Sequence, residues 1–290
     1  MKTPALWTVR EVLSWTRDRF AREGLESARL DAEVLLAYAL EMQRVGLYID
    51  LDRPLDEVER GRYRALVSRR LKREPVAYLV GEREFWSRPF AVDARVLVPR
   101  PDTETLVEHA LIFLRERTAP RVLDVGTGSG AIAVTLAAER PDARVVATDI
   151  SIEALEVAAV NSARHQVEVE LHAGDLLAAL PAAEPPFDLI AANLPYVAFA
   201  DRESLAPELL REPEAALFAK DGGLALLKRL ILEAPDHLIR PGGGLMLEVG
   251  LGQARAVSQL LQHAGISDQI TVIRDLAGIE RVVMGRLPGG

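Results

Sequence analysis

The sequence predicts an α/β protein with a doubly wound, mostly parallel sheet and a small N-terminal helical domain. Strand-like and helix-like segments alternate from residue 121 onward, which is typical of a parallel sheet with helices on both faces. A glycine-rich loop follows the first of these strands, and residues 1–74 read as helices. A chain of 290 residues can hold one large and one small domain, each with its own core.

Helices are expected in the N-terminal domain, residues 1–74. Thr8 and Glu11 form a Thr-x-x-Glu capping box ahead of a run of apolar residues. A second helix is expected to open at Ser27, and a third follows Pro54. The third helix has a basic side made of Arg60, Arg62, Arg64, Arg69, Arg70, Lys72 and Arg73. This basic side is either a solvated surface or a docking face for an acidic macromolecule.

Residues 75–101 mix aromatic, β-branched and turn residues, so we expect a β-hairpin that links the two domains. Asp102 is placed to cap the next helix, and the α/β domain spans residues 102–290. Its expected strands are 121–125, 144–149, 167–172, 187–192, 243–249, 269–273 and 279–285, and its expected helices are 130–139, 151–163, 222–239 and 252–264.

Composition excludes several classes of protein. The chain has no cysteine, which rules out disulfides, thiolate metal sites and a cysteine nucleophile, and its 5 histidines are scattered, so no metal site is expected. No apolar run reaches the roughly 18–20 residues of a membrane span, and the first residues lack the apolar core of a secretory signal. We therefore expect a cytoplasmic protein.

The charge is distributed unevenly. Residues 1–85 carry 16 Lys and Arg against 15 Asp and Glu, which is a net charge of +1. The remaining residues carry a net charge of −9, and the whole chain therefore carries −8. Neutralisation of phosphates supplies most of the affinity of proteins for nucleic acid, so an acidic α/β domain argues against tight binding of a duplex. A protein substrate fits better.

The loop after strand 121–125 has the composition of a ligand-binding turn. Its glycines permit a tight turn and close backbone approach, and the amides at the start of the next helix can face an anionic group. The spacing is G-x-G-x-G after an acidic residue, whereas a dinucleotide enzyme prefers G-x-G-x-x-G. The residues concerned are Gly126, Thr127, Gly128, Ser129 and Gly130.

Two acidic residues lie at the ends of the next strands. Asp149 ends the second strand, where its carboxylate can accept both hydroxyls of a ribose, although NAD enzymes share this feature and Asp149 could instead cap the helix at 151–163. Asp175 and Leu176 follow the third strand and could flank an adenine by hydrogen bonding and packing. Together with Asn193 at a further strand end, these residues favour S-adenosylmethionine as the cofactor.

The buried strand 187–192 ends at Asn193, Leu194, Pro195 and Tyr196. An amide nitrogen can attack carbon only if acceptors hold its N–H bonds. The Asn193 side-chain oxygen and the Leu194 carbonyl could provide two such acceptors, and Tyr196 could cover the flat face of the amide. Taken alone, the same four residues could be only a turn that ends a strand.

On these motifs the chain resembles the release-factor glutamine methyltransferase family over nearly its whole length. The matching motifs are 75–78 with 81–85, 98–104, 124–131, 149–151, 193–196, 212–213, 242–243 and 248–250. The expected seven-stranded sheet with its closing hairpin is that of class I S-adenosylmethionine-dependent methyltransferases.

The resemblance implies methyl transfer from S-adenosylmethionine to the side-chain amide nitrogen, N5, of the glutamine in the Gly-Gly-Gln motif of bacterial class-I peptide chain release factors. It implies cofactor contacts by residues 126–130, Asp149, Leu176 and Asn193, and glutamine contacts by residues 193–196. Two positions depart from the family: Leu194 replaces the first proline of Asn-Pro-Pro-Tyr, and Asp102 replaces a glutamate. The Leu194 backbone carbonyl is still available, but the rigidity of a proline ring is lost.

The expected partners are release factors, docked by the N-terminal domain, with no direct nucleic-acid or membrane contact, and we expect a monomer. Two other hypotheses stay open. Asn-Pro-Pro-Tyr-like motifs also hold the exocyclic amines of flipped bases, so an N6-adenine or N2-guanine methyltransferase is the alternative enzyme. The alternative that is not an enzyme is a regulator that binds the cofactor without catalysis. In that case, the replacement of proline by Leu194 would be the change that removed the activity.

Overall fold

The computed structural model describes residues 7–239 and 241–288. The chain divides into two compact units. Unit 1 comprises Met1–Gly81 with Ala206–Arg211, and unit 2 comprises Glu82–Leu205 with Glu212–Gly290. The chain therefore leaves unit 2 after Leu205, contributes six residues to unit 1 and returns to unit 2 at Glu212. Within the described ranges, no helix is both long and apolar enough to cross a membrane.

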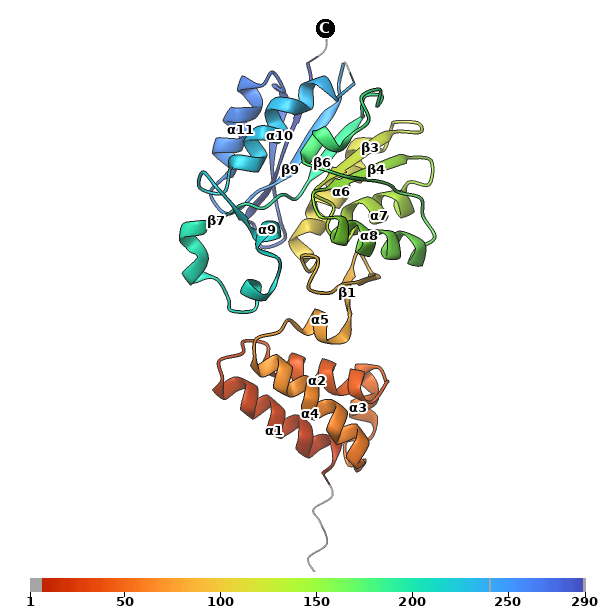
Figure 1. Cartoon of the computed structure of the whole chain (residues 1–290), viewed down its shortest axis with the longest axis vertical. Coiled ribbons are helices and arrows are strands. Elements are labelled where there is room, and N and C mark those ends of the chain that lie inside the picture. The colour runs from red at the N-terminus through yellow and green to blue at the C-terminus, as the bar shows by residue number, and fades with distance from the viewer. Residues whose placement is uncertain (1–6, 240, 289–290) are drawn as a thin grey trace, which may run out of the picture. The chain divides into compact units, whose positions relative to one another are not determined.

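Unit 1 is helical (Figure 1). Its helices are α1 (Val9–Arg22), α2 (Ala28–Ala39), α3 (Arg44–Ile49), α4 (Glu57–Leu71) and α5 (Val76–Val80). The capping box of Thr8 and Glu11 is confirmed, and Asp56 with Glu59 makes a second one at α4. Ser27 precedes α2, but its side chain makes no capping hydrogen bond. Two short helices were not expected: α3, and α5 where a hairpin was predicted.

A buried charge cluster corrects the prediction of a basic face on α4. Arg70 is only 6% exposed, and its guanidinium pairs with Asp31 at 2.7 Å and with Glu208 at 3.0 Å. Arg73 pairs with the same Glu208 carboxylate at 3.1 Å. These two arginines hold the segment 206–211 within unit 1, so they do not belong to a solvated basic surface.

Unit 2 opens with a hairpin that is much shorter than the expected 75–101. Strands β1 (Glu82–Phe85) and β2 (Arg88–Ala91) pair antiparallel, and a 3₁₀ turn, η1 (Pro101–Thr103), leads into helix α6 (Glu104–Leu114). The prediction that Asp102 caps this helix is wrong. Asp102 lies inside η1, and its carboxylate pairs with Arg281 at 3.0 Å.

The seven-stranded sheet of the described chain has the order β10-β11-β9-β6-β3-β4-β5. Strands β3 to β6 and β9 run parallel, whereas β11 runs antiparallel to both β9 and β10. The strands are β3 (Arg121–Val125), β4 (Arg144–Asp149), β5 (Glu170–Ala173), β6 (Leu189–Ala192), β9 (Gly244–Glu248), β10 (Asp268–Arg274) and β11 (Glu280–Arg286). This order confirms the predicted doubly wound sheet with a closing antiparallel hairpin.

After residue 121, two predicted elements differ from the observed ones by three residues or more at one or both ends, for local reasons. Strand β5 begins at Glu170 instead of 167, because the Val167 amide donates to the Ser162 carbonyl at the end of helix α8 (Ile152–Arg164). Helix α10 (Ala225–Glu233) is shorter than 222–239 because Pro235 cannot continue the α-helical ladder, and a 3₁₀ turn follows.

Alternate residues of each buried strand face two different hydrophobic cores. Leu123, Ile190 and Leu245 pack under α10 and α11 (Ala254–His263). Val122, Leu189 and Met246 pack on the opposite face with residues of α6 and of α7 (Ala131–Glu139). Figure 1 shows these two helical layers on either side of the sheet.

The sheet reverses its winding between β3 and β6, since β4 and β5 extend to one side and β6 and β9 to the other. Ligands of open α/β sheets bind outside the carboxyl ends of the strands at such a reversal. The loops that follow β3, β4 and β6 begin at Gly126, Ile150 and Asn193. The glycine loop, Asp149 and Asn193 therefore lie at neighbouring strand ends.

Candidate active site

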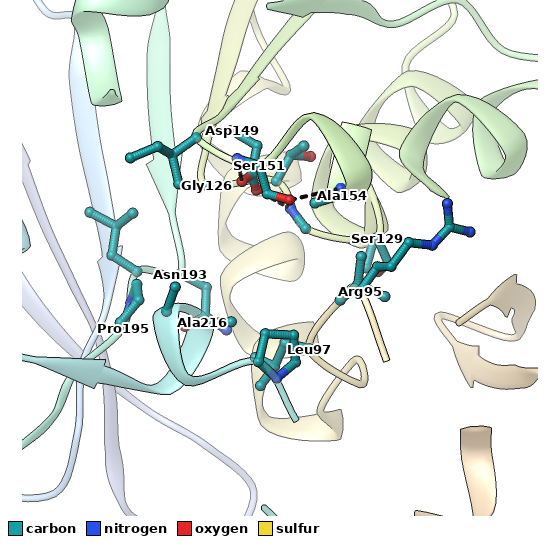
Figure 2. A pocket seen from close by; sticks show the side chains of 18 of the residues that line it. Arg95, Leu97, Gly126, Ser129, Asp149, Ser151, Ala154, Asn193, Pro195 and Ala216 are labelled. Carbon is teal, nitrogen blue, oxygen red and sulfur yellow. Dashed lines mark hydrogen bonds between the residues drawn. The ribbon is translucent and has the colours of Figure 1, made fainter. Parts of the chain in front are cut away.

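A cavity of about 590 Å³ opens at these strand ends (Figure 2). The predicted residues that line it are Gly126, Thr127, Gly128, Ser129, Asp149, Asp175, Leu176, Asn193, Leu194 and Pro195. Gly130 and Tyr196 do not line it. Within the described ranges, no group of three or more His, Asp or Glu side chains could hold a metal ion.

The glycine loop is held from below by a buried carboxyl. Asp124 Oδ2 accepts from Thr127 Oγ1 at 2.7 Å and from the Ala133 amide at 3.2 Å. Burial raises the pKa of Asp124 to about 7. Gly126 and Gly128 have φ values of +74° and +56°, in the left-handed region that favours glycine. Asp124 and the left-handed glycines thus fix the shape of the loop.

Gly130, predicted to contact the cofactor, lies outside the cavity lining and has a packing role. It has φ +81°, and a Cβ built on it would lie 3.2 Å from the Ala158 Cβ of α8. It therefore lets α7 start close against α8. Asn161, fully buried on α8, fixes the neighbouring part of the loop by donating to the Ser129 carbonyl at 2.8 Å.

Asp149 holds the loop as well as facing the cavity. Its Oδ2 accepts from the Gly128 amide at 2.8 Å, and its Oδ1 accepts from the Ser151 amide at 2.9 Å. Helix α8 is capped by Ser151, whose hydroxyl accepts from the Ala154 amide at 3.1 Å, so Asp149 is not that cap. Each carboxylate oxygen keeps further lone pairs for hydroxyl donors in the cavity.

Next to Asp149, the cavity wall is formed by two apolar side chains and by one acidic residue in an ion pair. Leu176 is buried at φ +50° and lines the cavity, and Ile150 also lines it with 69% of its surface exposed. Asp175 pairs with Arg229 at 2.9 Å and is exposed. Sequence reasoning missed Ile150, although an apolar side chain directly after Asp149 is a visible signal for a flat ring next to a ribose.

Asn193 has a defined orientation. Its amide Nδ2 donates to Thr103 Oγ1 at 3.0 Å, and Thr103 is only 4% exposed. In the described part of the chain, nothing donates a hydrogen bond to Asn193 Oδ1 or to the Leu194 carbonyl. Both oxygens predicted to receive an amide are thus available as acceptors.

Leu194 and Tyr196 are anchored differently from one another. The Leu194 side chain is 3% exposed, and its Cδ2 lies 2.8 Å from the place of a Cβ on Gly126, so the leucine packs directly on the glycine loop. Tyr196 lies outside the cavity lining, and its hydroxyl donates to Glu248 Oε1 at 3.3 Å. The prediction that Tyr196 covers the amide is therefore not supported by its position here.

Two residues that sequence reasoning missed fix the backbone of this loop. Gln253 Nε2 donates to the Tyr196 carbonyl at 2.9 Å. Gly223, at φ +87°, approaches the same carbonyl so closely that a Cβ on it would lie 2.0 Å from the oxygen. Both come from a chain segment far from residue 196, and no local pattern announces such a contact.

Glu212 supports the opposite wall of the cavity. It is 6% exposed, its Oε2 accepts from the Val98 amide at 2.9 Å, and its Oε1 accepts from the Arg100 guanidinium. Arg100 and Pro213 both line the cavity. The Glu-Pro pair at 212–213 thus ties the segment after the hairpin to the site.

A seven-stranded sheet in this order, with the last strand β11 inserted antiparallel between β9 and β10, is the class I S-adenosylmethionine-dependent methyltransferase fold. Two family models match the chain: the PrmC N-terminal domain at residues 11–81 and the methyltransferase small domain at residues 102–240. The chain belongs to the release factor glutamine methyltransferase family.

Relatives match over nearly the whole chain. A release factor glutamine methyltransferase of Geobacter sulfurreducens is 45% identical over 285 residues, which is 98% of both chains. One of Bordetella pertussis is 45% identical over 271 residues, 93% of this chain and 98% of the relative. Among solved structures, a methyltransferase from Pyrococcus furiosus shares the fold with a TM-score of 0.52 and 20% identity, over 76% of this chain and 97% of the other.

Proposed function

We propose that this protein transfers a methyl group from S-adenosylmethionine to the side-chain amide nitrogen, N5, of the glutamine in the Gly-Gly-Gln motif of class-I peptide chain release factors. The observation that carries the proposal is the pair of available acceptors, Asn193 Oδ1 and the Leu194 carbonyl, beside the glycine loop. The names and near-complete coverage of the relatives support release factors as the substrate.

The residues present fit S-adenosylmethionine. The cavity of about 590 Å³ has room for a nucleoside with an amino-acid tail. In this proposal Asp149 accepts the ribose hydroxyls, and Leu176 and Ile150 pack on the adenine. The amino-acid tail lies over Gly128, where an added Cβ would meet nothing within 4 Å. When bound, the cofactor supplies an electrophilic methyl group on its sulfonium.

The protein's own contribution is to hold the glutamine amide. A carboxamide nitrogen is a weak nucleophile because its lone pair is delocalised into the carbonyl. Asn193 Oδ1 and the Leu194 carbonyl can each accept one N–H of the substrate, which fixes the nitrogen in place and favours a tetrahedral shape. Positioning of this kind is worth roughly 7–11 kcal/mol of a barrier. No ionised base is needed before methyl transfer, because the proton is lost from the cationic product.

Leu194 in place of proline is compatible with this chemistry. The acceptor is the backbone carbonyl, which every residue carries, and the burial of the leucine side chain against Gly126 fixes the loop by packing. The rigidity that a proline ring would supply is thus replaced by a tertiary contact.

The test is to incubate the protein with methyl-labelled S-adenosylmethionine and three separate pools: release factors, ribosomal proteins and RNA. We expect label in the release factors only. Label in the RNA pool alone would instead favour an exocyclic-amine methyltransferase, against which the net charge of −9 beyond residue 85 already argues.

Asp149→Ala should weaken binding of S-adenosylmethionine at least about tenfold, since leaving buried polar partners unsatisfied costs ~1–3 kcal/mol. The substitution removes both the ribose acceptor and the bond to the Gly128 amide. Calorimetry on the wild type and the variant measures this, with Glu153→Ala as a control for an exposed acidic residue that lines the same cavity. Equal affinities for wild type and Asp149→Ala would remove this cofactor assignment.

We also propose that unit 1 docks the release factor and takes no part in the chemistry. Deleting residues 1–74 should raise the KM for the intact factor much more than it changes the Kd for cofactor. A short peptide that contains Gly-Gly-Gln provides the control, because its turnover should change little. Unchanged KM for the intact factor, with a truncated protein shown by its melting curve to be folded, would contradict the docking role.

A further inference from the structure

Behind Asn193 lies a set of buried polar side chains that the chemistry above does not use. Asn193 Nδ2 donates to Thr103 Oγ1 at 3.0 Å, and the Thr103 side chain is a hydrogen-bonding neighbour of the Glu248 carboxyl. Tyr196 donates to Glu248 Oε1 at 3.3 Å. Thr103 and Glu248 are 4% and 1% exposed, and within the described residues Glu248 Oε2 is buried and receives no hydrogen bond of regular geometry.

A buried carboxyl that is not an ion-pair partner calls for an explanation, because burying a charged group is costly. The nearest cation, Arg281, is engaged elsewhere: its Nη2 pairs with Asp102 at 3.0 Å and with Asp275 at 3.1 Å. Glu248 is therefore not needed to neutralise this arginine. Of its hydrogen-bonding neighbours, Tyr196 belongs to the loop 193–196, and Thr103 accepts a hydrogen bond from Asn193 at the start of this loop.

Hydrogen-bond valence sets the direction of this network. An ionised carboxylate only accepts, so the hydrogen bond by which Thr103 lowers the pKa of Glu248 uses the single proton of the Thr103 hydroxyl. Thr103 Oγ1 can then only accept from Asn193, which requires the NH₂ end of the carboxamide to point at Thr103. The oxygen end, Oδ1, is left to face the cavity. An unconstrained carboxamide could flip and present a donor to the substrate amide.

We propose that Thr103 and Glu248 are positioning residues that fix the Asn193 carboxamide with its oxygen towards the substrate glutamine. The inference rests on the proposed methylation of a glutamine amide and adds the means by which the acceptor is kept in the correct orientation. Tyr196 takes part from the other side, because its hydroxyl donates to the same carboxylate and so ties the end of the loop to Glu248.

Protonation of Glu248 switches this constraint. The pKa of Glu248 is raised to about 7, mainly by burial and to a smaller extent by Asp102, against the opposing effects of the Thr103 and Tyr196 hydrogen bonds and the charge of Arg281. Burial also raises the pKa of Tyr196, which stays a neutral donor. When Glu248 gains a proton it can donate to Thr103, and the Thr103 hydroxyl is then free to donate to Asn193 Oδ1. The relay formed by Glu248 and Thr103 therefore keeps the Asn193 oxygen towards the substrate at pH values above this pKa, and it loses this orientation at lower pH.

The test compares the full-length wild type with Glu248→Gln, Thr103→Val and Thr103→Ser. We expect kcat on intact release factor to fall about tenfold in Glu248→Gln and Thr103→Val, the lower end for loss of an outer partner of a functional side chain. The KM for the factor should change less, and Thr103→Ser should restore most of kcat because it keeps the hydroxyl. Wild-type kcat should drop as the pH falls through about 7, where Glu248 gains its proton, and Glu248→Gln should lose this dependence.

The outcomes separate the relay from the proposed function. If the wild type methylates no release factor, the proposed function fails. If the wild type is active but Thr103→Val keeps its kcat, or Thr103→Ser loses as much as Thr103→Val, the relay is wrong and the function stands. Should Glu248→Gln fail to fold, as judged by its melting temperature, the valine and serine pair decides alone, since valine replaces the Thr103 hydroxyl with a methyl group, whereas serine keeps the hydroxyl and removes only the methyl group.

Discussion

Asn193→Ala should lower kcat on release factor about 10²-fold, a loss of ~3 kcal/mol of transition-state stabilisation, as found for a comparable preorganised hydrogen-bonding group. The variant loses the Oδ1 acceptor and leaves the Thr103 hydroxyl without its donor. Affinity for S-adenosylmethionine should fall much less, because Asp149, Leu176 and the glycine loop remain in the cavity. Single-turnover rates and calorimetry on the same preparation measure the two effects separately.

Asn193→Asp is the matched control for shape. It keeps an acceptor of the same size but cannot donate to Thr103, and it places a second negative charge in a cavity that already holds Asp149. We therefore expect it to be impaired in kcat while it retains cofactor binding. An Asn193→Ala variant with wild-type kcat would refute the amide clamp itself.

Gly223→Ala should have the second large effect, because it acts on the backbone of the same loop. A Cβ on Gly223 would lie 2.0 Å from the Tyr196 carbonyl oxygen and 2.7 Å from its carbon, so the loop must move. Displacement of a reacting group by about 1 Å can cost 10²-fold in rate, and we expect a loss of kcat of about that size. The left-handed backbone at φ +87° adds ~1–2 kcal/mol of strain for alanine.

Gly222→Ala separates these two causes. Gly222 also has a positive φ, +61°, but a Cβ on it would meet nothing within 4 Å. It should lower the free energy of unfolding by the same ~1–2 kcal/mol of backbone strain and leave kcat near the wild-type value. Equal kcat values for the two alanine variants would show that the close approach of Gly223 to Tyr196 does not position the loop.

The parts of the fold that could be predicted are those with a local signal. Buried strands such as 121–125 are short apolar runs between turn residues, and the capping box of Thr8 and Glu11 is a local motif. The strand-end rule of parallel sheets then brings Asp149 and Asn193 to one cavity, as expected, without knowledge of any long-range contact.

The parts that could not be predicted depend on contacts between distant segments. Glu208 lies in the α/β part of the sequence but pairs with Arg70 and Arg73 in unit 1, so two of the seven residues of the predicted basic side belong to a charge cluster. Aspartate is a residue type that often caps helices, but the Asp102 carboxylate forms an ion pair with Arg281, which lies far along the chain. Gly130 fits a binding-loop pattern, but its role is the close packing of α7 and α8.

Within the site, the same limit explains which residues were missed. Gln253 and Gly223 contact the Tyr196 carbonyl, Thr103 accepts from the Asn193 side chain, and Glu248 accepts from the Tyr196 hydroxyl, all across large sequence separations. Their residue types carry no local signal of these roles, because a buried threonine or glutamate can serve many purposes. Only the folded structure shows which group each of these residues contacts.

The most direct test is to locate the methyl group. Purified release factor is incubated with the protein and S-adenosylmethionine, digested, and the peptide that contains Gly-Gly-Gln is fragmented in a mass spectrometer. We predict one added methyl group on the side-chain nitrogen of that glutamine, and none in a factor whose glutamine is replaced by alanine or in a reaction with the Asn193→Ala variant at matched times. A methyl group on any other residue, or an unmodified glutamine with label recovered in RNA, would contradict the assignment of this protein as a glutamine-amide methyltransferase of release factors.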